Sequence, residues 1–213
     1  MKISFHNSIE EISKESWDAL IGDLNYPFLK HDFLKTLEIT NCVGTNTGWI
    51  PIHITLKRGE ELIAAMPLYL KSHSQGEFVF DHSWANAFYQ HGLDYYPKLV
   101  SSIPHTPASG PRFLMKDGEE KSVLFEKIKE GVKMISSKNN ISSWHILFPE
   151  KDEINFYENS QLSIRKNAQF IWFNKNYKNF ENYLENFRSR HRKNVLKERN
   201  KIEEQDLIIE TLS

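Results

Sequence analysis

The stretch WIPIHITLKRGEELIAAMPLYLKS, residues 49–72, decides the fold. Its first arm alternates, and the apolar positions on one face are Ile50, Ile52, Ile54 and Leu56. A Gly-Glu turn leads into a second arm that is apolar on both faces, so the pair predicts a hairpin whose second strand is central in its sheet. Pro67 lies inside that second arm and cannot donate a ladder hydrogen bond, so we expect a bulge or splayed pairing there.

The segments around this hairpin predict further strands and helices. We expect strands at 2–9, 77–84, 141–149 and 162–174, and one fed by a shaped loop at 104–115. We expect helices at 13–24, 25–40, 94–103, 118–140 and 151–161, then a long polar helix over 179–205 and the start of a strand at 206–213. This order mixes hairpins with helices, which predicts an α+β fold with a mixed, largely antiparallel sheet.

The composition limits the class of protein. The 213 residues carry a net charge of −1, with 39% hydrophobic and 26% charged residues, which is typical of a water-soluble chain. No run approaches the roughly 18 apolar residues of a membrane span. The N-terminus lacks an apolar signal core, and the lone Cys42 cannot form a disulfide within the chain, so we expect a cytoplasmic location.

Five segments carry a family resemblance: PFLKHDFLKTLE (27–38), TGWIPIHITL (47–56), AAMPLYLKSHSQGEFVFDHSWANAF (64–88), YYPKLVSSIPHTPASGPRFL (95–114) and FRSRHRKNVLKERNKI (187–202). They resemble a bacterial family of N-acyltransferases related to FemAB proteins and often labelled peptidoglycan biosynthesis or recognition. The resemblance implies a fold like that of the GNAT acyltransferases. Family members are longer, so it also implies a first GNAT-like domain at 1–178, a linking helix at 179–205 and the opening of a second domain at 206–213.

The polar, aromatic stretch FDHSWANAFYQHGLDYYPKL, residues 80–99, is the first candidate site. Asp81 or His82 is the candidate general base, because acyl transfer to an amine requires removal of a proton. We expect the acceptor cleft to be lined by Trp84, Tyr89, His91, Tyr96 and His105. The alternative is an ordered, hydrogen-bonded loop with packed rings.

Two further segments are candidates for anion binding. In HTPASGPR, residues 105–112, the N–H groups of Ser109 and Gly110 and the guanidinium of Arg112 could form an anion nest; the alternative is a rigid turn with Arg112 in a structural ion pair. The helix at 188–201 has seven Lys or Arg against one acid. Its phosphate-binding candidates are Arg190, Arg192 and Lys193.

The ligand of this basic helix would be a nucleotide-linked cell-wall precursor or a tRNA acceptor stem, and the alternative is a solvated helix face. DNA binding is not indicated, because neither a helix-turn-helix pattern nor interleaved aromatic residues accompany the helix.

The resemblance implies acyl-CoA or aminoacyl-tRNA as donor. The Q/R-x-x-G-x-G/A turn that usually holds the pyrophosphate of coenzyme A is missing, so we expect the donor in the second half of the family fold. No metal is expected, since the four histidines between 73 and 105 lack metal-ligand spacing. The first hypothesis is an N-acyltransferase acting on an amine, and the second is a non-catalytic recognition or assembly module. A terminal strand left unpaired would also favour a homodimer.

Overall fold

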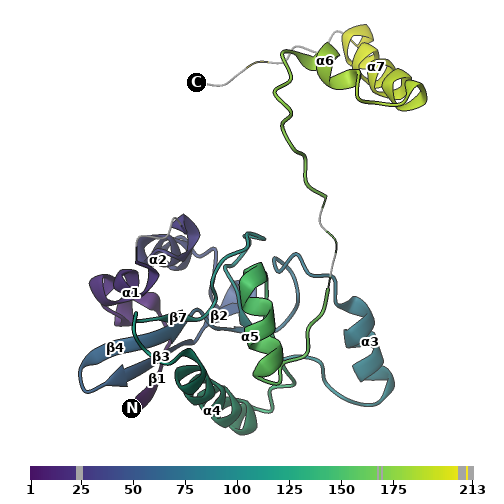
Figure 1. Cartoon of the computed structure of the whole chain (residues 1–213). Helices are drawn as coiled ribbons and strands as arrows, with labels where there is room; N and C mark the ends of the chain where they lie inside the picture. The colour runs from purple at the N-terminus through teal and green to yellow at the C-terminus, as the bar shows by residue number, and fades with distance from the viewer. Residues whose placement is uncertain (23–25, 167, 169, 206–209, 211–213) are drawn as a thin grey trace. The chain divides into compact units, whose positions relative to one another are not determined.

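The computed structural model describes residues 1–22, 26–166, 168, 170–205 and 210. The chain forms two compact units, unit 1 at Met1–Ile164 and unit 2 at Arg165–Ser213, and each is described by itself (Figure 1). The domain boundaries expected from the family resemblance stay predictions.

Unit 1 contains eight strands and five α-helices in its described residues. The strands are β1 (Lys2–His6), β2 (Trp49–Pro51), β3 (His53–Arg58), β4 (Glu61–Met66), β5 (Tyr69–Lys71), β6 (Lys98–Ser101), β7 (Leu114–Met115) and β8 (Trp144–Ile146). The helices are α1 (Lys14–Ile21), α2 (His31–Ile39), α3 (His82–Gln90), α4 (Lys121–Asn139) and α5 (Ile154–Asn159). Short 3₁₀ turns lie at Ile9–Glu11, Pro27–Leu29, Thr45–Thr47 and Lys151–Glu153.

The strands form two four-stranded sheets, in the orders β1-β3-β4-β7 and β2-β5-β6-β8. Every pairing is antiparallel except that of β6 with β8, which is parallel. The predicted α+β class with a mixed, largely antiparallel sheet is therefore confirmed. Since β7 pairs with β4 and β8 pairs with β6, the consecutive strands β7 and β8 belong to different sheets.

The predicted hairpin is confirmed, and its prolines mark the place where the two sheets meet. The first arm forms β2 and β3, which are separated by Ile52, and the second arm forms β4 and β5, which are separated by Pro67 and Leu68. The Ile52 N–H still donates to the Leu68 carbonyl oxygen at 2.9 Å, so the arms stay joined across the break. The interruption predicted at Pro67 is thus present, because proline has no N–H for the ladder.

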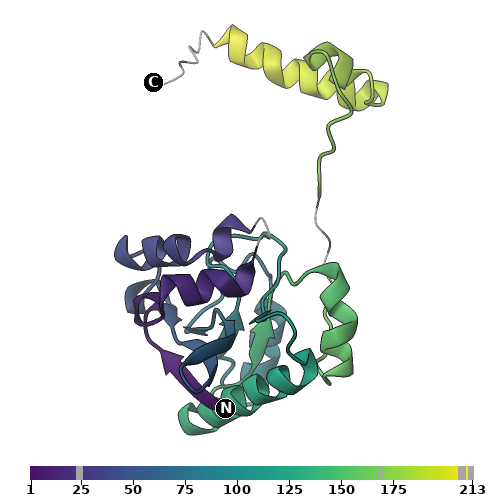
Figure 2. The same ribbon diagram turned by 60° about the vertical axis from the view of Figure 1, so that its left-hand side comes forward.

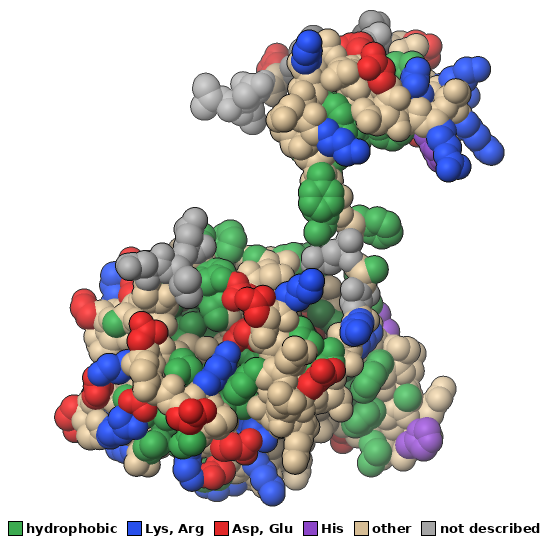
Figure 3. Space-filling model, in the orientation of Figure 1, with side chains coloured by type: hydrophobic (Ala, Val, Ile, Leu, Met, Phe, Trp, Pro, Cys, Tyr) green, Lys and Arg blue, Asp and Glu red, His purple; other side chains and the backbone are tan. Residues whose placement is uncertain are grey.

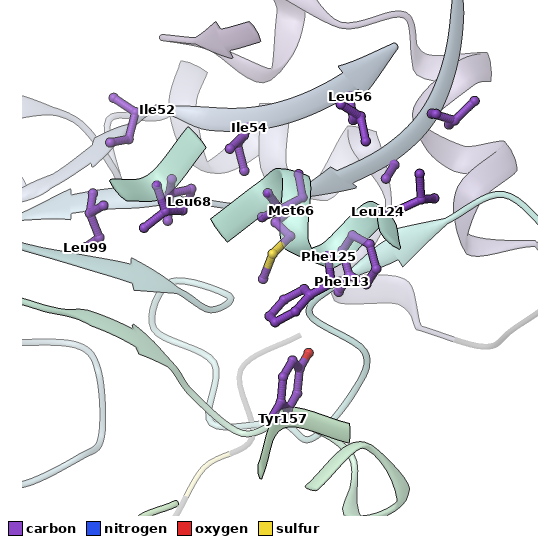
Figure 4. Close-up of a cluster of buried hydrophobic side chains, with 14 residues drawn as sticks. Ile52, Ile54, Leu56, Met66, Leu68, Leu99, Phe113, Leu124, Phe125 and Tyr157 are labelled. Atoms are coloured by element: carbon purple, nitrogen blue, oxygen red, sulfur yellow. The ribbon is translucent and has the colours of Figure 1, made fainter. Parts of the chain in front are cut away.

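Helices cover both faces of the first sheet. α1 packs against β4 and β7, and α4 packs against β3 and β1 on the opposite side (Figures 1 and 2). Ile54, Met66 and Phe125 belong to the largest buried cluster, which lies between the sheet and α4 (Figure 4). Burying apolar surface contributes roughly 25 cal/mol per Å², so this cluster stabilises the packing of α4 on the sheet.

Two secondary-structure predictions in unit 1 are wrong. Residues 77–81 form no strand, and the segment continues into α3 at His82. The helix expected over 94–103 is instead the strand β6, whose residues are all buried between β5 and β8. Leu99 and Val100 side chains have partners on both neighbouring strands, and this pairing overrides a weak local helical pattern.

Two predictions also change in unit 2. The described residues of 162–174 form no strand, and Phe170, Trp172 and Phe173 are exposed there rather than paired in a sheet. The long polar helix is divided into α6 (Phe180–Leu184) and α7 (Ser189–Glu204). The strand start expected at 206–213 lies outside the described residues, apart from Glu210.

Candidate functional site

The stretch at 80–99 is organised around one buried lysine. Lys98 lies on β6 with its side chain fully shielded from solvent. Its ammonium donates to Asp81 Oδ2 at 2.5 Å, to Glu77 Oε2 at 2.8 Å and to the Ser74 hydroxyl at 2.9 Å. The two carboxylates come from the loop before α3 and are also buried. Burying three ionisable groups is costly unless they pair, so this cluster fixes the loop to the sheet.

The cluster shifts the pKa values of its two carboxylates in opposite directions. Burial acts to raise the pKa of Asp81, but hydrogen bonds from Lys98, Ser74 and Tyr95 outweigh it, so the pKa is lowered. Burial raises the pKa of Glu77, although Lys98 opposes it. Tyr95 donates to Asp81 Oδ2 at 2.7 Å, and burial with this bond raises the phenol pKa. Asp81 is therefore an ionised partner of Lys98.

A second buried lysine lies beside the first. Lys71 on β5 stands opposite Lys98 in the β5–β6 register. Its ammonium donates to the Gln75 carbonyl oxygen at 3.1 Å and lies 3.8 Å from the centroid of the Trp49 ring. Burial lowers the pKa of Lys71 to about 8. Sequence reasoning missed both lysines. The signal was a lysine at the terminus of an otherwise apolar strand: Lys71 is the last residue of β5, and Lys98 is the first residue of β6.

Most residues of α3, which carries the middle of the stretch, are exposed. His82 begins the helix, and Trp84 and Tyr89 are 52% and 54% exposed. His91 ends the helix, and its Nδ1 lies 2.8 Å from the Ala87 carbonyl oxygen. The sequence stretch is thus divided between a buried ionic cluster and an exposed helix that carries imidazole and aromatic side chains.

Tyr96 belongs to the cluster around Lys98 and not to the exposed helix. It is half-buried, and its hydroxyl lies 2.7 Å from the Ser74 hydroxyl, which also accepts from Lys98. The structure therefore brings together Asp81, Tyr95 and Tyr96 around Lys98, and it leaves His82 outside that group.

Arg112 binds carbonyl groups of its own chain. The guanidinium is buried and donates to the carbonyl oxygens of Leu147 at 2.8 Å, Gly110 at 3.0 Å and Ala108 at 2.5 Å. The Gly110 N–H donates to the Phe148 carbonyl oxygen at 3.2 Å. Burial lowers the pKa of Arg112 to about 10. The groups expected to form an anion nest therefore hold the 105–112 loop against the chain after β8.

The other two candidates of that loop are exposed. Ser109 faces solvent, and His105 Nε2 lies 3.2 Å from the Cys42 carbonyl oxygen. Asp81 and Arg112 are fully buried whereas His82 is exposed, so the three do not meet at one solvent-open cleft.

The turn before α4 is acidic. Asp117, Glu119 and Glu120 precede the helix, and Gly118 adopts a positive φ of 80°. A helix N-terminus attracts anions through its free N–H groups, but neighbouring carboxylates repel a pyrophosphate. This helix start therefore does not resemble a coenzyme A site.

The three phosphate-binding candidates on the basic helix α7 have different surroundings. Arg190 and Lys193 are exposed, and Lys and Arg side chains gather over the helices of unit 2 in Figure 3. Arg192 instead donates to the carbonyl oxygens of Leu184 at 3.1 Å and Phe187 at 3.3 Å. It therefore caps the C-terminal end of α6, which favours a structural role for this arginine.

Within the described part of the chain, no group of three or more His, Cys, Asp or Glu side chains is placed to hold a metal ion. Among the same residues, no helix is both long and apolar enough to cross a membrane.

Several solved structures are similar to this chain, and their titles name acetyltransferases. An aminoglycoside 6'-N-acetyltransferase of Acinetobacter haemolyticus is 10% identical, with 82% of this chain and 98% of that chain covered and a TM-score of 0.48. A ribosomal-protein-alanine N-acetyltransferase of Brucella melitensis is 7% identical, with 81% and 100% covered and a TM-score of 0.49. TM-scores below 0.5 do not by themselves establish a shared fold.

No curated protein matches this sequence significantly. The FemAB-like family, described as peptidoglycan biosynthesis/recognition, matches residues 8–213. This match spans nearly the whole chain and agrees with the resemblance carried by the segments at 27–38, 47–56, 64–88, 95–114 and 187–202. The chain therefore belongs to the FemAB-like family.

Proposed function

We propose that the protein is an N-acyltransferase that moves an acyl or aminoacyl group onto an amine of a peptidoglycan precursor in the cytoplasm. The observation that carries the proposal is the match of the FemAB-like family over residues 8–213. In the reaction, the acceptor amine attacks the acyl carbonyl, a base takes the amine proton, and a thiol or a tRNA hydroxyl leaves.

We assign the acceptor, not the donor, to unit 1. The acidic turn of Asp117, Glu119 and Glu120 would repel acyl-CoA, so acyl-CoA or aminoacyl-tRNA is expected to bind outside this helix start. The exposed side of α3 offers His82 as base, since its imidazole is accessible to solvent at the start of the helix and carries a nitrogen that can accept a proton. Trp84 and Tyr89 on the same helix would contact the acceptor. Asp81 would position α3 through Lys98 rather than contact the substrate.

A second candidate function is a non-catalytic recognition module for the same precursor. The enclosure of Asp81 and Arg112 favours it, because neither side chain is open to a ligand in this structure. Asp81 accepts hydrogen bonds from Lys98 and Tyr95 instead, and Arg112 donates to backbone carbonyl groups.

The test is a product assay on the whole chain, read by mass spectrometry. The protein is incubated with a UDP-linked muropeptide and either acetyl-CoA or aminoacyl-tRNA, beside His82→Ala and the exposed α3 control Gln90→Ala. Product that requires His82 but not Gln90 supports the proposal. Equal product from all three proteins would retain acyl transfer but remove His82 as its base.

A thermal-shift measurement separates the two candidate functions. A ligand that binds only the folded chain raises the melting temperature by mass action. A muropeptide-dependent shift without product would favour the recognition module. The absence of both product and shift would contradict both functions.

A further inference from the structure

Unit 2 contains a pocket of about 460 Å³ within residues 172–183. Four aromatic rings and two amides line it: Trp172, Tyr177, Phe180, Tyr183, Asn174 and Asn179. This size lies within the range of small-molecule sites, and an aromatic lining with a few polar groups is typical of them.

The rings are held by one another and by the helix cap. Tyr177 and Tyr183 meet edge to face with centroids 5.2 Å apart, and the Trp172 and Tyr177 centroids are 6.2 Å apart. Asn179 Oδ1 accepts from the Asn182 N–H at 2.8 Å and caps α6. Trp172 is 61% exposed, so much of this side chain is accessible to a ligand.

Cationic residues lie in the segment that lines this pocket and beside one of its rings. Lys175 and Lys178 lie in its lining segment and are exposed, and the Arg199 guanidinium lies 4.3 Å from the centroid of the Phe180 ring. The stretch 172–180 contains no acid. Residues 165–213 carry eleven Lys and Arg against seven Asp and Glu, whereas residues 1–164 carry sixteen against twenty-one. This asymmetry favours an anionic ligand for unit 2.

We propose that the pocket holds the base of a nucleotide, with its phosphates on Lys175, Lys178 and Arg199. Proteins hold unpaired bases without sequence preference by stacking each base on an aromatic side chain, with cations beside it. A neutral sugar would also suit aromatic rings and amides, but it would not require the surrounding cations. The proposal rests on unit 2 alone and does not depend on acyl transfer.

The nucleotide could belong to a single-stranded RNA or to a nucleoside diphosphate conjugate, and α7 distinguishes them. Arg190, Lys193, Lys197 and Lys201 are exposed and recur at i, i+3, i+7 and i+11, which places them on one helix face. Arg192 and Arg199 lie on the opposite face. A single nucleotide in the pocket would therefore not reach this stripe, whereas a longer polyanion would.

The experiment measures binding to the whole chain. Fluorescence anisotropy follows a short labelled oligouridylate, and calorimetry follows uridine diphosphate. Trp172→Ala should weaken both on the order of tenfold, because it removes a ring on which the base stacks. Trp172→Phe should retain most of the affinity. Phe170→Ala is the matched control, since this ring is exposed in the same segment but does not line the pocket.

Charge variants then identify the source of the nucleotide. Lys175→Gln with Lys178→Gln should weaken both ligands, whereas Lys193→Gln with Lys197→Gln should weaken only RNA. If the latter pair has no effect, the ligand is a small nucleotide. Lys133→Gln with Lys138→Gln, on exposed α4 positions of unit 1, should leave both affinities unchanged.

Three outcomes would overturn the proposal. One is the absence of binding to either ligand. Another is binding that Trp172→Ala leaves intact. The third is binding of neutral N-acetylglucosamine in the pocket in place of the nucleotide, read as a change in Trp172 fluorescence.

Discussion

Lys98 Nζ lies 2.5 Å from Asp81 Oδ2, and both side chains are shielded from solvent. The carboxylate that the sequence offers as a general base is thus one of two buried carboxylates that pair with Lys98. Such a pair contributes little net stability compared with an apolar pair, but removing one partner leaves an uncompensated buried charge.

Asp81→Asn should lower the free energy of unfolding by about 1.5–3 kcal/mol at neutral pH, because Lys98 loses one charged hydrogen-bond acceptor but keeps Glu77. The pKa of Asp81 is lowered in the folded state, so its stabilisation is present above the unfolded pKa and is lost as pH falls through the folded pKa. Urea unfolding at several pH values measures both effects. His82→Ala is the matched control at the next position and should cost little, because its side chain is exposed.

Arg112→Lys should destabilise unit 1 by about 2–4 kcal/mol, because one ammonium cannot reach all the carbonyl groups that the guanidinium binds. Arg58→Lys is the control. Arg58 is exposed and pairs with Glu119 at 2.7 Å, so its replacement should cost below about 1 kcal/mol. Equal losses in the two variants would contradict a structural role for Arg112.

Lys71→Met should change how stability depends on pH. The folded pKa of about 8 lies below the ordinary lysine pKa of 10.5, so the unfolded chain binds more protons between these values and stability rises with pH there. Below pH 8 the buried ammonium costs on the order of 1–3 kcal/mol. The variant should be more stable at pH 7 and should lose the rise, in a comparison of thermal unfolding at pH 7 and pH 10.

Arg192→Met should loosen α6, whereas Arg190→Met should not. Arg192 satisfies carbonyl oxygens at the end of α6, but Arg190 is exposed. Hydrogen exchange read over residues 180–187 by mass spectrometry should rise in the first variant alone. Faster exchange in both variants would mean that the charge of α7, rather than this cap, holds the two helices together.

The sequence predicts the elements whose patterns are strong. Alternation in β3 and apolar residues on both faces of β4 give the observed elements. Pro67 correctly predicts a break in the ladder, since a missing N–H acts locally.

The weak patterns fail where distant partners decide the structure. β6 is a strand because β5 and β8 lie on either side of it, and that pairing is not visible in the 94–103 sequence. The expected strand at 162–174 is missing from the described residues of that range.

The sequence by itself determined the α+β class, the hairpin and the residue types of the candidate sites. Only the tertiary structure decided their roles. Whether Asp81 faces Lys98 or His82, and whether Arg112 binds an anion or its own carbonyl groups, depends on burial. A buried charge must find a partner inside the protein, and that partner can be far away in the chain, where periodicity and spacing carry no information about it.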